Sequence, residues 1–393
     1  MSSICGIIDF YSDRISFERI RDMGRSMVLR GREQSGAYIE RGVALHHNRM
    51  ILTSAQSERQ PYNFKRGEDS YSVIFDGEIY GIDDFSEPME FYGFESSPRA
   101  LLEAYLAFGC ECVEHIDGAF AFAIYDKTRK EVLVARDREG LKPLYYMNDG
   151  EKFVFASEIK GMLRYLCHSA EIDKAAVAEN IRAPIGSISG GDIYKEIHEL
   201  PAGSFALHSR LGTQISAYRR TEIRKEAKSK FENRLLCPDI RTAYHDVPSL
   251  LHEIMIGFDY PCFDEYMPSF LAFIKANRAQ KRVSIEDVTL NIDPEYSAER
   301  ADRLGMMNGV MVNVLTPQNE KAFKNNGFHR CEKNLAQEVQ RLFSDRSSKV
   351  CTMLGGEFFD LIKKEKDVKQ RARSYAMIIQ TEQWLNTYPV FWI

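Results

Sequence analysis

The sequence lacks a long apolar run and a surplus of positive charge. No segment approaches the ~18 consecutive apolar residues that span a membrane, so we predict no membrane contact. Lys and Arg number 52 against 57 Asp and Glu, and the net charge of −5 disfavours a nucleic-acid partner. Hydrophobic residues still make up 44% of the 393-residue chain, which is enough apolar surface for a globular protein of about two domains.

Dense cysteine clusters are also missing. The eight cysteines are scattered, and Cys110 and Cys112, which flank one residue, have no second pair downstream. This spacing differs from that of zinc sites and of disulfide scaffolds, so we predict no metal and reduced thiols. The N-terminus has no basic segment followed by an apolar core, as a secretory signal would. We therefore predict a cytoplasmic protein.

The first two hundred residues are rich in short apolar or alternating runs. Such runs predict β-strands, here at Val73–Tyr80, Ala121–Asp126, Glu131–Asp137 and Lys152–Ser157. Helical spacing of apolar residues predicts helices at Pro98–Phe108 and, more weakly, at Phe17–Val28. The pattern indicates an α+β fold dominated by antiparallel strands.

The pattern changes after a charged run at Arg219–Lys230, which is typical of a solvated linker or helix. We place a domain boundary between 208 and 209, giving domains 1–208 and 209–393. In the second domain, helices predicted at Ser249–Ile256 and Ser269–Asn277 alternate with apolar strands. Three such strands are predicted, at Val288–Ile292, Val310–Leu315 and Lys349–Leu354. Alternation of this kind favours a parallel α/β sheet.

Cys5 allows two interpretations. A cysteine at the start of a chain can act as a nucleophile with its own α-amino group as the base, because that amine titrates near neutrality. Met1 to Ile4 would first have to be removed for Cys5 to be so placed. Alternatively, Cys5 is a buried thiol in a core strand that continues into Ile7 and Ile8.

The motifs around Cys5 favour a family assignment. Together they resemble, in order, the glutamine-hydrolysing half of asparagine synthetases, which are class II glutamine amidotransferases. The matching segments are Cys5–Ile7, Arg30–Gly36, Leu45–Met50, Gln60–Pro61, Phe75–Tyr80, Asp117–Ala123, Arg136–Tyr146, Ala156–Lys160 and Leu200–Gly203. Nine segments in the family's order over about two hundred residues are far more specific than any one of them.

The resemblance implies an N-terminal-nucleophile αββα sandwich in which Cys5, once processed, attacks the amide of glutamine. It also implies that Arg49 binds the α-carboxylate of glutamine, that Gly77 offers a backbone N–H, and that Glu78 meets the α-ammonium. Taken alone, Arg49 could equally form a surface ion pair, and Asp76–Glu78 could be an ordinary turn at a strand edge.

Three departures from the family pattern argue against glutaminase activity. Asp76 stands where the family has an oxyanion-stabilising Asn, and a carboxylate has no donor to offer there. Ser97 stands where the family has an Asp that helps to hold the ammonium group of glutamine. Residues 1–4 precede Cys5 and would have to be cleaved.

The second domain resembles the synthetase half only thinly. The resemblance implies an adenine nucleotide alpha hydrolase-like fold, yet the glycine-rich phosphate loop of that half is missing. The best positional match is Asp264–Ser269, where Asp264 brings negative charge to a phosphate site and Ser269 begins the predicted helix. Gly355, Gly356 and Glu357 resemble a second nucleotide-site loop, or they form an ordinary turn. We therefore expect ATP and magnesium only if this domain is active.

These features predict an asparagine synthetase-like protein whose glutaminase and ATP-dependent synthetase activities are impaired or lost. Such a pseudoenzyme would serve as an interaction partner in a biosynthetic pathway, with glutamine or a similar small molecule as a ligand and with a homodimer or protein partner. The alternative is an active amide-forming ligase that uses Cys5 after N-terminal processing.

Overall fold

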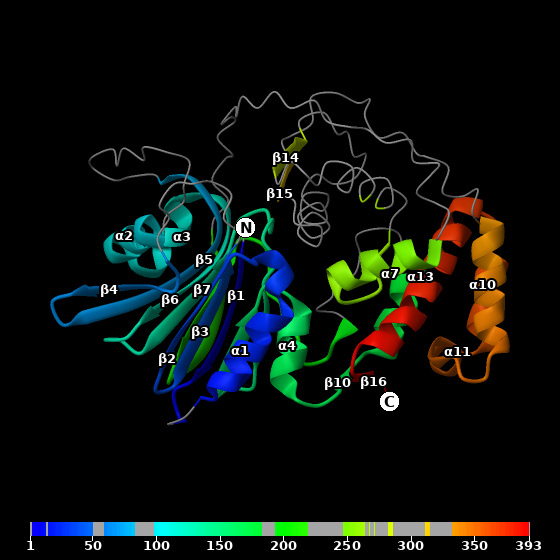
Figure 1. Cartoon of the computed structure of the whole chain (residues 1–393), viewed down its shortest axis with the longest axis horizontal. Coiled ribbons are helices and arrows are strands. Elements are labelled where there is room, and N and C mark those ends of the chain that lie inside the picture. Colours follow the sequence, from blue (N-terminus) through cyan, green and yellow to red (C-terminus); the bar gives the residue numbers. More distant parts are fainter. Residues whose placement is uncertain are drawn as a thin grey trace. The chain divides into compact units, whose positions relative to one another are not determined.

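The computed structural model describes residues 2–12, 15–49, 59–82, 98–182, 193–218, 247–263, 267, 271, 282–285, 311–314 and 332–392 (Figure 1). The chain divides into two compact units. The first comprises Met1–Tyr165 and Glu199–Glu232, and the second comprises Leu166–His198 and Asn233–Ile393. The predicted boundary between residues 208 and 209 stays a prediction.

The first unit contains two antiparallel sheets. The first sheet has the strand order β11-β8-β9-β1-β3-β2, with β11 (His198–Glu199) at the point where the chain passes between the units. Its other strands are β8 (Tyr145–Asn148), β9 (Lys152–Ala156), β1 (Ser2–Asp9), β3 (Val43–Arg49) and β2 (Gln34–Glu40). The N-terminal strand β1 therefore lies inside the sheet, paired with β3 on one side and β9 on the other.

The second sheet has the order β13-β12-β7-β6-β5-β4. Its strands are β13 (Gly212–Ala217), β12 (Ser204–Ser209), β7 (Glu131–Arg136), β6 (Ile116–Asp126), β5 (Asp69–Ile82) and β4 (Tyr62–Arg66). Each neighbouring pair is antiparallel. The α+β class with antiparallel sheets is therefore confirmed.

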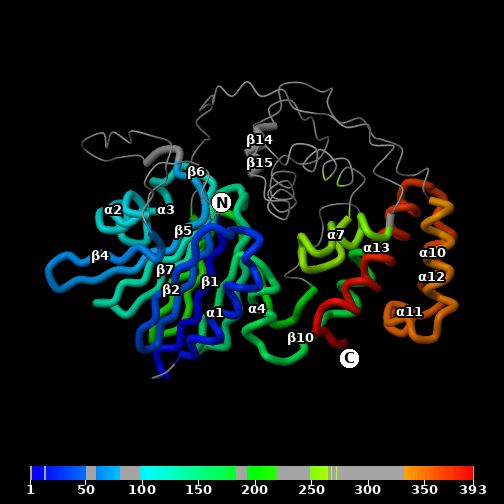
Figure 2. The backbone as a smooth tube through the Cα atoms, viewed as in Figure 1, coloured from blue at the N-terminus to red at the C-terminus, as the bar shows by residue number. Residues whose placement is uncertain are grey.

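Helices cover the outer faces of both sheets. Helix α1 (Phe17–Ser26), followed by the 3-10 turn η1 (Val28–Arg30), packs on β1 and β3, and α4 (Ile159–Leu166) follows β9 (Figure 2). Helix α2 (Pro98–Phe108), turn η2 (Gly109–Glu111) and helix α3 (Cys112–His115) cover the second sheet, where residues such as Leu101 and Val113 pack against Phe75 and Phe122. The layers of this unit are thus helix, sheet, sheet, helix.

Strand alternation decides which side chains enter the space between the sheets. Ile4 and Ile8 of β1, Leu45 of β3 and Ile74 of β5 belong to the core between the two sheets. Because successive side chains of a strand point to opposite faces, even-numbered residues of β1 face the second sheet and odd-numbered ones, such as Cys5, face the helical layer.

The second unit is mainly helical in its described part. The 20-residue helix α13 (Val368–Thr387) contacts α5 (Lys174–Arg182), α7 (Val247–Phe258), α10 (Glu332–Ser344), α11 (Lys349–Leu354) and α12 (Gly356–Lys363). Trp384 of α13 is fully buried and donates Nε1–H to Tyr194 and to the carbonyl of Asp259, at 3.0 Å each. Strand β10 (Ala170–Glu171) pairs in parallel with β16 (Val390–Phe391). This pairing fixes the end of the chain.

The predicted elements hold best in the first unit. Four strands are found as β5, β6, β7 and β9, and α2 has the predicted bounds. In the second unit α7 confirms the helix at Ser249–Ile256, and β15 (Met311–Val314) lies within the predicted strand at Val310–Leu315. It pairs in parallel with β14 (Arg282–Ile285). The predicted parallel α/β sheet stays a prediction, and Ser269–Asn277 and Val288–Ile292 lie outside the fully described residues.

The strand predicted at Lys349–Leu354 is wrong, since these residues form helix α11. The Ser348 side chain accepts a hydrogen bond from the backbone N–H of Cys351 at 3.3 Å and caps the helix, which ends at Gly355. These end signals outweigh the apolar content of the segment. None of the helices in the described ranges is both long enough and apolar enough to span a membrane.

Candidate functional site

Cys5 lies in the middle of strand β1 and is fully buried on the face covered by helices. It pairs in register with His46 on one side and Ala156 on the other. Burial raises the pKa of the Cys5 thiol far above its usual range, which disfavours the reactive thiolate. The predicted nucleophile therefore points away from the second sheet, and its role stays a prediction that this position disfavours.

Ser2, three residues earlier, stands at the start of β1 on the face toward the second sheet. Its backbone N–H donates to Asp76 Oδ1 at 2.8 Å, and its carbonyl accepts from Arg30 Nε at 3.0 Å. Arg30 in turn contacts Asp76 Oδ2 through Nη2 at 3.2 Å. One arginine and one aspartate therefore hold both backbone polar groups of Ser2.

Arg30 and Asp76 are a buried ion pair, with both side chains 0% exposed. A second carboxylate, Glu158 Oε1, lies 3.8 Å from Arg30 Nη1, and Lys160 Nζ lies 3.2 Å from Glu158 Oε2. Buried charges persist only when they are paired in this way. The four side chains form an alternating charge network beside the start of β1.

Strand β5 supplies the side of this site that belongs to the second sheet. Asp76 follows Ile74 on the inward face by alternation, and Glu78, which is half-buried, follows Asp76. Gly77 between them has a φ of +142°, and a Cβ there would lie 2.0 Å from the carbonyl oxygen of Ala119. Only glycine fits this position, so the Asp-Gly-Glu segment is held in one backbone conformation.

Arg49, at the end of β3, is the register partner of Ser2. Its Nη1 lies 3.5 Å from Oε1 of Gln34. The backbone of Gly31 passes so close that a Cβ there would lie 2.4 Å from the backbone nitrogen of Arg49. Ser2 is thus linked to Arg49 by strand register and to Asp76 by a hydrogen bond, and Gly77 and Glu78 follow Asp76 along β5. Ser97 lies outside the described residues.

Two buried histidines of β3 lie near the site, His47 on the face toward the second sheet and His46 on the face toward helix α1. His47 Nε2 lies 3.2 Å from the carbonyl oxygen of Phe75, and His46 Nε2 lies 3.1 Å from the Ser35 hydroxyl. Burial lowers the pKa of His47 to about 3 and that of His46 to about 4. Both imidazoles are therefore neutral near pH 7 and bring no positive charge to the site.

Gln60 completes the surroundings of Asp76. Its Oε1 accepts a hydrogen bond from the backbone N–H of Phe75 at 2.7 Å. The peptide bond to Pro61 is cis. The Gln-Pro pair of the sequence motif therefore positions the strand segment immediately before Asp76.

The chemistry available at Asp76 is that of an acceptor. Both of its carboxylate oxygens already receive hydrogen bonds, from Ser2 and from Arg30. An ionised carboxylate offers no N–H or O–H to a developing oxyanion, whereas an amide at the same place would. Asp76 can therefore accept from cationic or N–H groups, but its own side chain supplies no donor for an acyl-transfer transition state.

Sequence reasoning missed three residues of this site: Ser2, Arg30 and Glu158. Side chains two residues apart on a strand point to the same face, so Ser2 lies on the same face of β1 as Ile4, toward the second sheet. The alternation of the strand could therefore have predicted the position of Ser2. Arg30 opens a quoted motif, but its partner Asp76 lies 46 positions away. Only the fold shows that pairing.

The candidate nucleotide-binding residues of the second unit are arranged differently. Gly355 has φ +77° and joins helices α11 and α12, and Gly356 and Glu357 are exposed. A phosphate loop would instead follow a strand and point several backbone N–H groups inward. Asp264 and Ser269 lie outside the described residues.

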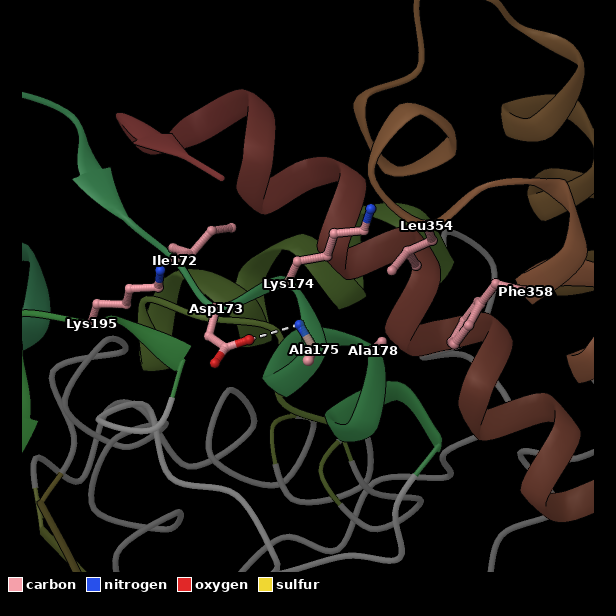
Figure 3. A pocket seen from close by; sticks show the side chains of 8 residues that line it. All are labelled: Ile172, Asp173, Lys174, Ala175, Ala178, Lys195, Leu354 and Phe358. Atoms are coloured by element: carbon pink, nitrogen blue, oxygen red, sulfur yellow. Dashed lines mark hydrogen bonds between the residues drawn. The ribbon is translucent and has the colours of Figure 1, made fainter. Parts of the chain in front are cut away.

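A cavity of about 400 Å³ lies beside this turn (Figure 3). Its lining is mostly apolar, with Ile172, Ala175, Ala178, Leu354 and Phe358, and with Asp173, Lys174 and Lys195 as the polar residues. Asp173 already accepts a hydrogen bond from the backbone N–H of Ala175 at 2.7 Å. Lys195 pairs with Glu171 at 2.5 Å. These residues do not fit a nucleotide triphosphate, and within the described ranges no three His, Cys, Asp or Glu side chains gather as metal ligands.

The similarity to a known family falls mainly on the residues of the first unit. The model of the glutamine amidotransferase domain family matches residues 1–219. Asparagine synthetase [glutamine-hydrolyzing] 3 of Bacillus subtilis is 30% identical over 234 residues, which are 58% of this chain and 38% of that protein. A putative asparagine synthetase [glutamine-hydrolyzing] 2 of Methanocaldococcus jannaschii is 31% identical over 226 residues, covering 51% of this chain and 43% of the relative.

The chain therefore spans less than half the length of these two relatives. A solved structure of the allosteric regulatory enzyme of purine biosynthesis aligns with a TM-score of 0.41 and 14% identity, covering 82% of this chain and 68% of that one. A score of this size supports no conclusion. Because the family model spans more than half of the sequence, this chain belongs to the glutamine amidotransferase domain family and is similar to asparagine synthetases.

Proposed function

We propose that this protein keeps the glutamine amidotransferase fold but does not release ammonia from glutamine. It would then act as an asparagine synthetase-like partner protein in a biosynthetic pathway. The observation that carries the proposal is Asp76, whose carboxylate is buried and engaged by Arg30 and Ser2. Loss of one oxyanion donor typically slows acyl transfer by ~100 to 1,000-fold, and a negative charge in its place adds repulsion.

The residue that lies beside Asp76 supports the same conclusion. Ser2, not Cys5, lies beside Asp76 and in register with Arg49. Freeing Cys5 would delete Ser2, Ser3 and Ile4 from β1. The lost contacts would include the 2.9 Å hydrogen bonds that join the backbone of Ile4 to the Ser157 hydroxyl and backbone N–H. Cleavage before Cys5 would therefore remove the part of β1 that contacts Asp76 and Arg30, which argues against the alternative with a processed Cys5.

Cleavage before Ser2 would produce a different group at the same place. The α-ammonium of Ser2 would lie about where its N–H now donates to Asp76, 2.8 Å away. An adjacent carboxylate stabilises the protonated amine and so makes it a weaker base. Ser2 would thus present a hydroxyl without an effective base beside it.

Recognition of glutamine is the part of the family's chemistry that the site retains best. Arg49, on β3 of the first sheet, and Glu78, on β5 of the second sheet, carry opposite charges. Ser2, the register partner of Arg49, donates to Asp76, two residues before Glu78. A guanidinium and a carboxylate are the groups that bind an α-carboxylate and an α-ammonium. We therefore propose glutamine, or a similar amino acid, as a ligand that binds without being hydrolysed.

The test is ammonia release from glutamine by the purified full-length chain. We expect no release above the rate without protein, in wild type and in Cys5→Ala alike. The double variant Ser2→Cys with Asp76→Asn restores a thiol and an amide donor, and Glu158 remains to compensate Arg30. We expect this variant to gain measurable activity.

Ammonia release by the wild type that Cys5→Ala abolishes would overturn the proposal. Intact-mass analysis of the same preparation shows which residue is the first one. The two measurements together distinguish a chain that is inactive because its N-terminus is not cleaved from a chain that is cleaved and still does not hydrolyse glutamine.

A further inference from the structure

The end of the helical cluster in the second unit carries a concentration of lysines. Residues 361–373 contain six Lys and Arg against two Asp and Glu, a surplus of four in a chain whose net charge is −5. Five exposed lysines form what we call the basic surface: Lys333, Lys363, Lys364, Lys366 and Lys369. Its positive charge therefore runs against the balance of the whole protein.

Three elements bring the lysines together. Lys363 ends α12, Lys364 and Lys366 lie in the short connection that follows, and Lys369 stands in the first turn of α13. A chain of seven residues keeps these four side chains within one small area. The ion pair from Arg371 Nε to Glu332 Oε1, at 2.8 Å, places the start of α10 and hence Lys333 beside them.

The nearby carboxylates contact groups other than the ammonium groups of these lysines. Asp367 accepts hydrogen bonds from the backbone N–H groups of Lys369 at 2.8 Å and Gln370 at 3.4 Å. Glu365 accepts from the backbone N–H of Asp367 at 2.9 Å. Glu332 pairs with Arg371. Within the described residues, no acidic side chain forms an ion pair with a lysine of the basic surface.

The lysines do not serve helix α13 itself. Asp367 caps the helix through the backbone N–H groups of Lys369 and Gln370, and its carboxylate is the charge that a helix N-terminus favours. Lys369, in the first turn, opposes the helix dipole, so its charge adds nothing to the stability of α13.

We propose that the basic surface binds an acidic segment of a partner polypeptide. Lysines are mobile point charges that suit carboxylates in varied geometry, while planar, paired recognition of phosphate favours arginine. Phe359, the aromatic residue beside Lys363, offers no open face to a stacking base, because it is 5% exposed and Lys363 Nζ lies 4.0 Å from its ring centre.

The test measures the binding of a short fluorescent peptide of alternating Glu and Ser to the full chain by anisotropy. We expect binding that weakens as salt rises, because salt screens exposed charges. The variant Lys364→Glu with Lys366→Glu should weaken the affinity about tenfold, as expected from reversing two of five nearby charges.

The matched control is Lys65→Glu with Arg66→Glu, which reverses two exposed charges of strand β4 in the other unit. It changes the net charge equally and should leave the affinity within about twofold, because these charges lie outside the basic surface. Equal weakening in both variants would overturn the proposal, as would tighter binding of single-stranded DNA of the same net charge. The outcome is independent of glutaminase activity.

Discussion

The two units of this chain treat charge in opposite ways. In the first, Arg30 and Asp76 are fully buried in a network that holds the start of the chain. In the second, lysines such as Lys364 and Lys366 lie in solvent while the neighbouring carboxylate of Asp367 caps helix α13. In the first unit, strand pairing brings residues that are distant in the sequence into one site. In the second unit, charged residues that are close in the sequence lie together on the surface where two helices are joined.

The largest expected difference between the two units is in the free energy of unfolding that a buried and an exposed ion pair contribute. Asp76→Ala removes the nearer of the two carboxylates that contact the buried guanidinium of Arg30, and loss of one partner in a buried pair costs about 3–5 kcal/mol. Glu338→Ala in α10 breaks an exposed pair with Arg341 and should cost ~0.5 kcal/mol or less. Urea unfolding followed by circular dichroism measures both.

Tryptophan fluorescence supplies the control for this pair of variants. Both tryptophans, Trp384 and Trp392, belong to the second unit. Asp76→Ala should shift the circular dichroism transition and leave the fluorescence transition in place. Equal and small shifts for Asp76→Ala and Glu338→Ala would show that the buried pair is not a structural element.

A second contrast concerns two glycines with positive φ. At Gly77 a methyl group would overlap the backbone of β6, 2.0 Å from an oxygen, whereas at Gly355 it would meet open space. Gly355→Ala should therefore cost about 1–2 kcal/mol from backbone conformation alone. Gly77→Ala should cost about 3 kcal/mol or more, because steric overlap adds to the conformational cost.

Thermal unfolding of the two glycine variants measures this difference. Gly67, in the turn between β4 and β5, has a φ of +61° and open space, so Gly67→Ala is a control within the first unit. It should behave like Gly355→Ala. A cost at Gly77 no larger than at Gly67 would mean that β5 can shift to accept a side chain there.

The sequence predicts the features that depend on neighbouring residues, and it does not predict those that depend on contacts between residues far apart in the chain. The helix Pro98–Phe108 and the four strands depend on local spacing, which the sequence shows directly. The roles of Asp76, Gly77 and Arg49 stay predictions of the motif resemblance, although Ser2 is in register with Arg49 and donates to Asp76. The place of Cys5 depends on which face of β1 is inward, and the motif match alone did not show that. The burial of Arg30 depends on a partner in another sheet, which local pattern cannot reveal.

The smallest expected effect is the loss of folding stability at low pH that His208 of the first unit causes. His208 is 1% exposed and stacks between Phe10 and Phe153 at ring distances of 5.7 and 5.6 Å. Burial lowers its pKa to about 4, while Asp149 and Asp9 oppose this shift. The unfolded chain therefore takes up the proton first as pH falls below ~6.5, and stability is lost progressively down to about pH 4.

His208→Phe removes the titrating group and keeps an aromatic ring between Phe10 and Phe153. It also loses the contact between Nδ1 and the Thr213 hydroxyl, at 2.8 Å, so we expect a cost of ~1 kcal/mol at pH 8. At pH 5 the wild type should have lost about 2 kcal/mol through His208, since each unit of pKa difference contributes ~1.4 kcal/mol. The variant should thus match or exceed the wild type at pH 5, as measured by urea unfolding at both pH values. Parallel losses in the two proteins would assign the acid sensitivity to His46 and His47 instead, beside the Ser2 site.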